Sequence, residues 1–249
     1  MRYRITLSYN GSAFCGWQIQ NNAVSVQGEL EKAIGTLLRE TVKVVGAGRT
    51  DSGVNAIGYV AHFDCRDDAL EKNGMDSCGA LCRKLNALLP KEIAIHSAEV
   101  APEGFHARFS ARRRQYKYYI HQEKDPFKDA FSWYCRFKFD VDRMNRACGY
   151  LTGVLDCSSF EKKGSDNATS ICEIFSAGWV VGQDGSLTFT IEANRFLRNM
   201  VRAIVGTMVD IGRGVHEPEF ILELLDGGSR TDAGQSVPGH ALFLTGIEY

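Results

Sequence analysis

The stretch of sequence that decides the fold is VKVVGAGRTDSGVNAIGYVAHF, residues 42–63. It begins with a short apolar run, Val42–Val45, which predicts a strand leading into a glycine-rich loop. Beyond the loop, Tyr59, Ala61 and Phe63 alternate with their neighbours, which is the period of a second strand. Phosphate-binding loops lead into the N-terminus of a helix. They carry either the dinucleotide-binding motif G-x-G-x-x-G or a P-loop that ends in Gly-Lys-Ser/Thr. Neither spacing is present, so the stretch argues against a nucleotide-binding α/β fold.

The first half of the chain reads strand, helix, strand, strand, helix, strand. Ser25 is a suitable N-cap for the first helix, whose apolar residues follow the 3.6-residue period as far as Leu38. The second helix is expected to stop before Pro90, because the residue preceding a proline avoids helical geometry. The expected strands are 5–9, 42–45, 59–63 and 93–95, and the expected helices are 26–38 and 81–89.

The second half repeats this order without detectable sequence identity. Asp140 is the expected N-cap of a helix running to Leu151, and the strongest helix signal in the chain runs from Asn194 to Ile211. Further elements are expected as a strand at 116–120, a hairpin of 171–181 with 187–191, a helix at 220–225 and a strand at 242–249. Alternating elements with hairpin turns predict an α+β fold of antiparallel sheets covered by helices. The division is expected near residue 105, giving halves 1–105 and 106–249.

The overall charge names no partner, since 29 Lys and Arg against 30 Asp and Glu give a net charge of −1. Basic residues do cluster locally, between residues 108 and 117, with no acidic residue among them. Such a cluster fits phosphate contacts to RNA, although a solvated strand face is the alternative. Its members are Arg108, Arg112, Arg113, Arg114 and Lys117, and a helix carrying Arg195, Arg198 and Arg202 on one face would extend it.

The cysteines and the hydropathy pattern indicate a cytoplasmic protein. The chain has eight cysteines and no secretory signal pattern, which is typical of reduced thiols. No apolar stretch approaches the length that spans a bilayer. Cys78 and Cys82 form a close pair that no second Cys or His pair answers at zinc-site spacing, so we expect no metal site.

Asp51 is the candidate for covalent chemistry. Aspartate side chains ordinarily ionise near pH ~4, so a carboxylate can attack carbon without a base to activate it. Arg49 stands two residues away and can stabilise the ionised form, and the glycines on both sides let a ligand approach the backbone. The alternative is a turn residue that only bonds its own backbone.

The segment GRTDSGVNA, residues 48–56, resembles the active-site motif GRTDAGVHA of the tRNA pseudouridine synthase A family. Further blocks follow in the family's order and cover nearly the whole chain. They are YNGSAFCGWQ (9–18), FHARFSA (105–111), YKY (116–118), Phe196 with NMVR (199–202) and VG (205–206), and LFL (242–244). Ser52 and Asn55 replace the usual Ala and His of the motif, Phe243 stands where Tyr is common, and an expected Arg is absent near residues 169–171.

The resemblance assigns roles by position. Asp51 matches the nucleophile, Tyr116 the aromatic residue that packs on the target base, and Arg49 and Arg202 basic residues of the catalytic cleft. A uracil removed from its stack needs an aromatic face, which supports this role for Tyr116, although half-buried strand tyrosines are common. Arg202 lies beside the apolar arc of its helix, so its stem is expected to be buried and its guanidinium paired with Asp51. The alternative is an arginine whose stem covers the edge of the core.

The resemblance also implies a reaction and an architecture. It implies isomerisation of uridine to pseudouridine at tRNA positions 38, 39 and 40, through attack of Asp51 on ribose C1′ or base C6, with no cofactor. It implies a homodimer of chains built from two ferredoxin/RRM-like α/β halves, related by a pseudo-two-fold with the active-site cleft between them. Two rival functions are a non-catalytic RNA-binding protein on this scaffold and a small-molecule hydrolase.

Overall fold

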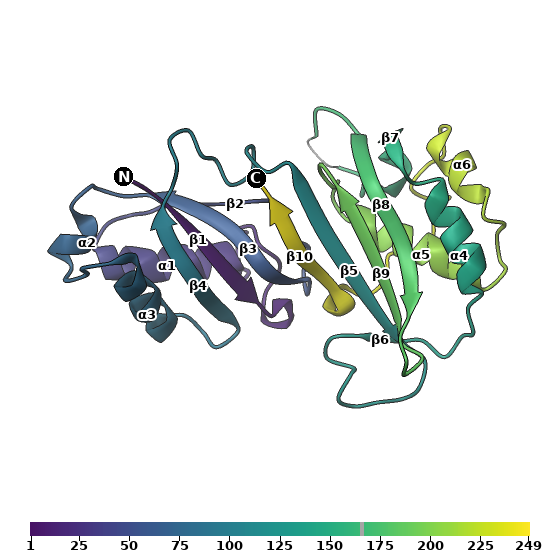
Figure 1. The fold of residues 1–249 in the computed structure, drawn as a ribbon, viewed down its shortest axis with the longest axis horizontal. Coiled ribbons are helices and arrows are strands. Elements are labelled where there is room, and N and C mark those ends of the chain that lie inside the picture. Colours follow the sequence, from purple (N-terminus) through teal and green to yellow (C-terminus); the bar gives the residue numbers. More distant parts are fainter. Residues whose placement is uncertain (165–166) are drawn as a thin grey trace. The chain divides into compact units, whose positions relative to one another are not determined.

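The structure, a computed structural model, describes residues 1–164 and 167–249 as two compact units. Unit 1 comprises Met1–Arg112 with Leu244–Tyr249, and unit 2 comprises Arg113–Phe243. In each unit, helices pack against a mainly antiparallel sheet (Figure 1), so the predicted α+β class is confirmed. The functional division near residue 105 stays a prediction. Within the described ranges, the helices are too short or too polar to cross a membrane.

Unit 1 has the predicted order strand, helix, strand, strand, helix, strand. Its elements are β1 (Arg2–Tyr9), α1 (Val26–Leu38), β2 (Val44–Gly46), β3 (Asn55–Asp64), the short α2 (Ala69–Lys72), α3 (Cys78–Leu88) and β4 (Ile93–Val100). The strands run in the order β4-β1-β3, with β2 also paired to β3, and these pairs are antiparallel. This is the strand order of a ferredoxin-like βαββαβ unit. The final strand β10 (Leu242–Glu248) pairs with β3.

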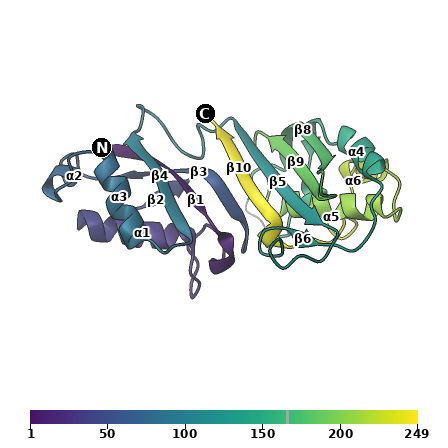
Figure 2. The same ribbon diagram turned by 60° about the horizontal axis from the view of Figure 1, so that its bottom comes forward.

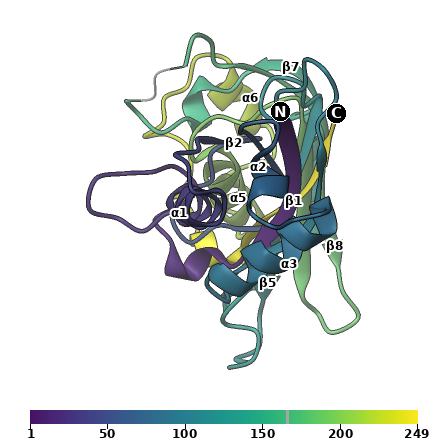
Figure 3. The ribbon, with the colours of Figure 1, turned by 90° about the vertical axis from the view of Figure 1, so that its left-hand side faces the viewer.

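Helix α1 begins where the sequence predicts, whereas α3 begins three residues before the expected residue 81. The Ser25 side chain accepts a hydrogen bond from the backbone of Gly28 at 3.2 Å, and α1 ends at Arg39, which has left-handed geometry. Ser77 caps α3 in the same way, accepting from Ala80 at 3.2 Å. Both helices lie against the unit 1 strands in Figure 2, and in Figure 3 α1 is seen along its axis, to one side of β1.

Unit 2 differs from unit 1 in having three strands, not two, between its first two main helices. Its elements are β5 (Arg113–His121), β6 (Trp133–Tyr134), α4 (Val141–Gly149), β7 (Gly153–Asp156), β8 (Ile171–Val181), β9 (Leu187–Ala193), α5 (Met200–Gly212) and α6 (Phe220–Leu225). The strand order is β5-β9-β8-β7, with antiparallel pairs, and the two-residue β6 pairs parallel to β5. Asp140 caps α4 as predicted, accepting from Arg143 at 3.0 Å. In the described part of both units together, three 3₁₀ turns lie at Gly11–Ala13, Ser158–Phe160 and Gly239–Ala241.

The predicted start of the helix at Asn194 is wrong, because α5 begins at Met200. Asn199 has a φ of 66°, a left-handed geometry that an α-helix interior does not admit. Asn194 instead follows β9 directly and exchanges hydrogen bonds with Glu173 of β8 at 2.9 and 3.0 Å. Arg195 and Arg198 therefore precede the helix and do not share a helical face with Arg202.

Candidate active site

The Asp51 loop, defined as residues 47–54, joins two paired strands of unit 1. Gly46 at the end of β2 faces Ala61 of β3, and the backbone of Ala47 donates to Val60 at 2.9 Å. The loop is followed by β3 and not by a helix, as the sequence predicts. Asp51 is half-buried, and its carbonyl accepts from the backbone of Val54 at 3.1 Å. This bond closes a tight turn around the nucleophile candidate, with Gly53 at a φ of 77°.

The segment Phe14–Trp17 lies along the Asp51 loop and holds its backbone. The backbone N–H of Trp17 donates to the Thr50 carbonyl at 3.2 Å, and that of Gly53 donates to the Phe14 carbonyl at 3.4 Å. A Cβ on Gly16 would collide with the Thr50 carbonyl oxygen, and Gly16 has a φ of +92°. The two segments therefore approach each other at a distance that only glycine allows.

Asn55, one of the departures from the family motif, has a structural role behind the loop. It is 2% exposed, and its Oδ1 accepts a hydrogen bond from the backbone of Gly11 at 2.8 Å. The hydroxyls of Tyr9 and Thr50 lie 2.9 Å apart in the same buried layer. The block of residues 9–18 is thus tied to the Asp51 loop by side-chain bonds as well as by its backbone.

Tyr59 and Trp17 form a ring pair against the first residues of the loop. Their rings stack with centroids 4.3 Å apart, and Tyr59 is fully buried. The Tyr59 hydroxyl accepts from the backbone N–H of Gly48 at 3.3 Å and donates to the Gly48 carbonyl. Sequence reasoning missed both residues as supports of the site, although Trp17 lies in a block that carries the family resemblance.

Arg49 is exposed on the outer side of the same loop. Its Nε donates to Oε1 of Gln18 at 3.2 Å, which links it to the segment that follows Trp17. The loop therefore presents a cation and, two residues later, the Asp51 carboxylate from one anchored backbone. A carboxylate of this kind can attack carbon, and a guanidinium can hold an anionic ligand.

Tyr116 and Arg202 lie in unit 2. Tyr116 is 9% exposed on β5, and its ring meets the ring of Phe196 edge-on, with centroids 5.0 Å apart. Arg202 is half-buried in the first turn of α5, where its Nε donates to the carbonyl of Val237 at 2.7 Å. The Val237 backbone donates back to the Arg202 carbonyl at 3.3 Å, so the loop before β10 fixes the base of this side chain.

The predicted basic cluster does not occupy a single face of β5. Side chains alternate along a strand, so Arg114 lies on the same face of β5 as Tyr116. Its Nη1 donates to the carbonyl of Asn194 at 2.6 Å. Arg113 alternates onto the opposite face with Lys117, and it pairs with Glu192 at 2.9 Å. The remaining members, Arg108 and Arg112, are exposed in unit 1.

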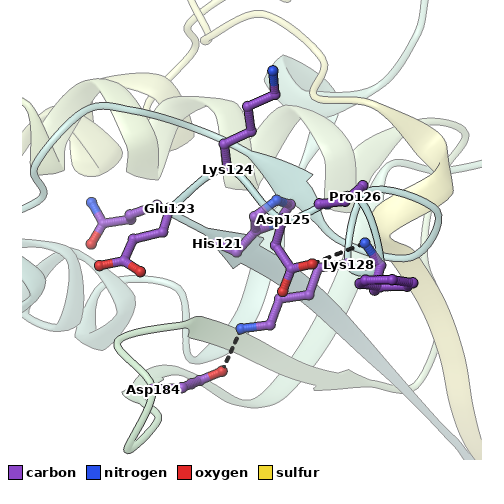
Figure 4. A pocket seen from close by; sticks show the side chains of 9 residues that line it. His121, Glu123, Lys124, Asp125, Pro126, Lys128 and Asp184 are labelled. Carbon is purple, nitrogen blue, oxygen red and sulfur yellow. Dashed lines mark hydrogen bonds and ion pairs between the residues drawn. The ribbon is translucent and has the colours of Figure 1, made fainter.

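A hollow of about 240 Å³ in unit 2 lies at residues that the sequence did not predict (Figure 4). It is lined by His121–Lys128 and Asp184, and Lys128 pairs with Asp184 at 2.7 Å. Its base is held by His121, which contacts Ser132 at 3.0 Å and Asp129 at 3.1 Å. None of the predicted site residues lines this hollow, so it does not bear on the chemistry of Asp51.

Thiol and imidazole groups do not gather into a metal site in the part of the chain that the structure describes. Across residues 1–164 and 167–249, no three His, Cys, Asp or Glu side chains are grouped so as to hold a metal ion. Cys78 and Cys82 are half-buried free thiols of α3. The described residues thus offer no ligand set that could be argued for a metal.

Several known proteins with similar sequences are named tRNA pseudouridine synthase A. A family model described as tRNA pseudouridine synthase matches residues 5–110 and 147–249. A tRNA pseudouridine synthase A of Parabacteroides distasonis is 46% identical over 250 residues, covering 100% of this chain and 96% of the relative. The Bacillus subtilis protein of that name is 38% identical over 253 residues, covering 100% and 99%, and the Fervidobacterium nodosum protein is 38% identical over 245 residues, covering 98% and 97%.

Matches of this extent identify an isomerase. The chain belongs to the tRNA pseudouridine synthase family, so the resemblance drawn from its motifs is confirmed.

Proposed function

We propose that this chain isomerises uridine to pseudouridine at positions 38, 39 and 40 of the tRNA anticodon arm, with Asp51 as covalent nucleophile. The observation that carries the proposal is the construction of the Asp51 loop, which is anchored by Trp17, Gly16 and Tyr59. The loop bears the family's motif and presents a half-buried carboxylate. An anchored carboxylate suits attack on carbon, because its approach is fixed before the substrate binds.

The target uridine has to leave its stack, since its glycosidic bond and C5 edge cannot both be reached inside a helix. Asp51 then attacks ribose C1′ or base C6, and the C1′–N1 bond breaks. The uracil rotates and forms a C1′–C5 bond, the proton on C5 passes to solvent, N1 regains a proton, and the carboxylate is released. The product is an isomer of the substrate, so this scheme needs no cofactor and no metal.

The residues of unit 2 complete the proposed site. Tyr116 is the face on which the flipped uracil packs, and Phe196 sets the angle of its ring. Arg202 is proposed to pair with Asp51, the role that the family resemblance gives it. The carbonyl of Val237 already orients the Arg202 guanidinium at 2.7 Å. Arg49 and the basic cluster would position the tRNA backbone.

The cellular setting follows the same proposal. The protein would work in the cytoplasm, where unmodified tRNA and reduced thiols coexist. It would act as a homodimer in which one tRNA touches both subunits. Sedimentation of the chain with and without tRNA, over a range of protein concentrations, would test this assembly.

Transcripts of one tRNA with uridine at only position 38, 39 or 40 would test the reaction and its positions. The proposal predicts pseudouridine in each transcript after incubation with the protein, and none in a transcript with cytidine at all three positions. Tight binding with no pseudouridine in any transcript would favour a non-catalytic RNA-binding protein. Hydrolysis of the glycosidic bond without reattachment would favour a hydrolase.

A further inference from the structure

Phe109 is an apolar ring that unit 1 exposes on a hydrogen-bonded turn. The side chain is 77% exposed, in a segment that follows the packed residues Phe105 and Ala107. Scattered exposed apolar residues are common on protein surfaces. What sets this one apart is the number of contacts that fix its position.

The turn from His106 to Ser110 is closed by four hydrogen bonds. Nδ1 of His106 accepts from the backbone N–H groups of Arg108 and Phe109, each at 3.2 Å. The backbone of His106 donates to Ser110 Oγ at 3.0 Å, and the backbone of Ser110 donates to the His106 carbonyl at 2.9 Å. Nδ1 can accept hydrogen bonds only when the imidazole is neutral, and burial favours the neutral form by lowering the pKa of His106.

Beneath Phe109, a series of ring contacts leads from the surface to the core through His106 and His62. Phe109 stacks on His106 with centroids 4.4 Å apart, and His106 meets His62 at 4.8 Å. His62 is 2% exposed, and its Nδ1 accepts from the backbone of Ala107 at 3.1 Å. His62 in turn meets Phe105 edge-on at 6.2 Å. One face of the Phe109 ring is therefore packed against protein. An aromatic ligand that stacks on the exposed ring would find the side chain already fixed, so binding would cost little conformational entropy.

The charge around Phe109 suits a polyanion. The guanidinium of Arg108 lies 5.7 Å from the ring centroid, and Arg112 is exposed three residues further on. Residues 104–118 contain no acidic side chain. An aromatic ring beside arginines is the combination that binds an unpaired base together with its phosphate.

We propose that Phe109 is a stacking platform for an unpaired nucleobase of the tRNA substrate, and that Arg108 contacts the adjacent phosphate. This rests on the proposed function, because tRNA is taken as the substrate. The base concerned is not the reacting uridine, for which Tyr116 is the proposed partner. The platform adds affinity for the folded tRNA and takes no part in the isomerisation.

Equilibrium binding of an unmodified tRNA transcript tests the platform, with every variant in an Asp51→Asn background so that bound tRNA is not converted. Phe109→Ala is expected to weaken binding by roughly 5- to 150-fold, the range for loss of one base–aromatic stack. Phe109→Trp is expected to bind within about twofold of the parent. Phe127, which is 92% exposed in unit 2 beside Asp125, provides the matched control, and Phe127→Ala should bind as the parent does.

The salt dependence separates stacking from charge. Phe109→Ala should leave the slope of log affinity against log salt unchanged, whereas Arg108→Ala should reduce it by about one unit. Equal affinity of the parent and Phe109→Ala would overturn the platform, and so would an equal loss in Phe127→Ala. If the parent protein bound no tRNA, the proposed function itself would fail. If the parent bound tRNA and Phe109→Ala bound it equally well, only the platform would fail.

Discussion

The hydroxyl of Tyr59 bonds both backbone groups of Gly48, three residues before Asp51. Because the Tyr59 ring is fully buried against Trp17, this contact ties the start of the Asp51 loop to the core of unit 1. The loop bearing the nucleophile candidate is thus supported from below by Tyr59 and along one side by residues 14–17.

Tyr59→Phe removes this contact while it keeps the buried ring. We expect kcat to fall roughly tenfold with KM for tRNA nearly unchanged, because a loosened loop misplaces the carboxylate. The free energy of unfolding should fall by about 2 kcal/mol, because two hydrogen bonds of about 1 kcal/mol each are lost. Tyr150→Phe, which loses an exposed bond to Glu219 at 3.1 Å, is the control for loss of a tyrosine hydroxyl away from the loop and should keep kcat. A parallel fall of kcat in both variants would contradict this role for Tyr59.

Gly16→Ala should destabilise the protein by more than about 2 kcal/mol and inactivate it, because the new methyl group collides with the Thr50 carbonyl and the φ of +92° is strained. Gly74 also has a positive φ, +66°, but a Cβ there meets only Lys84 Nζ at 3.9 Å. Gly74→Ala should therefore cost about 1 kcal/mol and retain activity. Chemical unfolding and turnover measured on both variants would check this, and equal losses would refute the close approach.

The stability of unit 1 should depend on pH through His62. Burial, helped by the positive charge of Arg2, lowers the pKa of His62 from 6.5 to about 4. The unfolded chain then binds more protons than the folded chain between these values, so stability falls as pH falls from 6.5 towards 4. We expect a loss of about 2 kcal/mol from this group between pH 7.5 and pH 5.

Urea unfolding of the wild type and His62→Gln at pH 7.5 and 5 would measure this term. The wild type should lose more stability than the variant over that interval, since other titrating groups contribute alike to both. An equal loss in the two proteins would show that His62 binds protons equally well in the folded and the unfolded chain, and the explanation would fail.

Tyr116→Ala should lower kcat by roughly 5- to 150-fold, the range for one lost base–aromatic stack, and change tRNA affinity by less than threefold. Tyr116→Phe should keep most of the turnover, because the ring also preserves the packing on Phe196. Single-turnover rates and equilibrium binding distinguish the two effects. Matching losses of rate and affinity in Tyr116→Ala would indicate a purely structural tyrosine.

Local rules in the sequence account for much of the fold. Helix α1 could be predicted because Ser25 caps it and its apolar residues follow one period to Leu38. The start of α5 could not, since the apolar pattern continues through residues 194–199 while Asn199 adopts left-handed geometry. That geometry depends on tertiary contacts, among them the bond from Asn199 to Ser236 at 2.6 Å.

In the candidate site too, residues that are consecutive in the sequence could be predicted, whereas contacts between distant residues could not. The motif around Asp51 could be identified from sequence, because its residues are consecutive. The supports of the loop could not, since Tyr59 reaches Gly48 across eleven positions and Gly11 reaches Asn55 across 44. Arg113 and Arg114 looked equivalent in the basic cluster, yet strand alternation places them on opposite faces of β5.

The most direct test of the account is release of tritium from uridine C5 of an unmodified tRNA by wild type and Asp51→Asn. The substitution keeps the size of the side chain and removes the nucleophilic carboxylate. We predict stoichiometric release by wild type and no release by Asp51→Asn, with tRNA affinity unchanged within about threefold. Release by Asp51→Asn at a rate close to that of wild type would contradict a covalent role for Asp51.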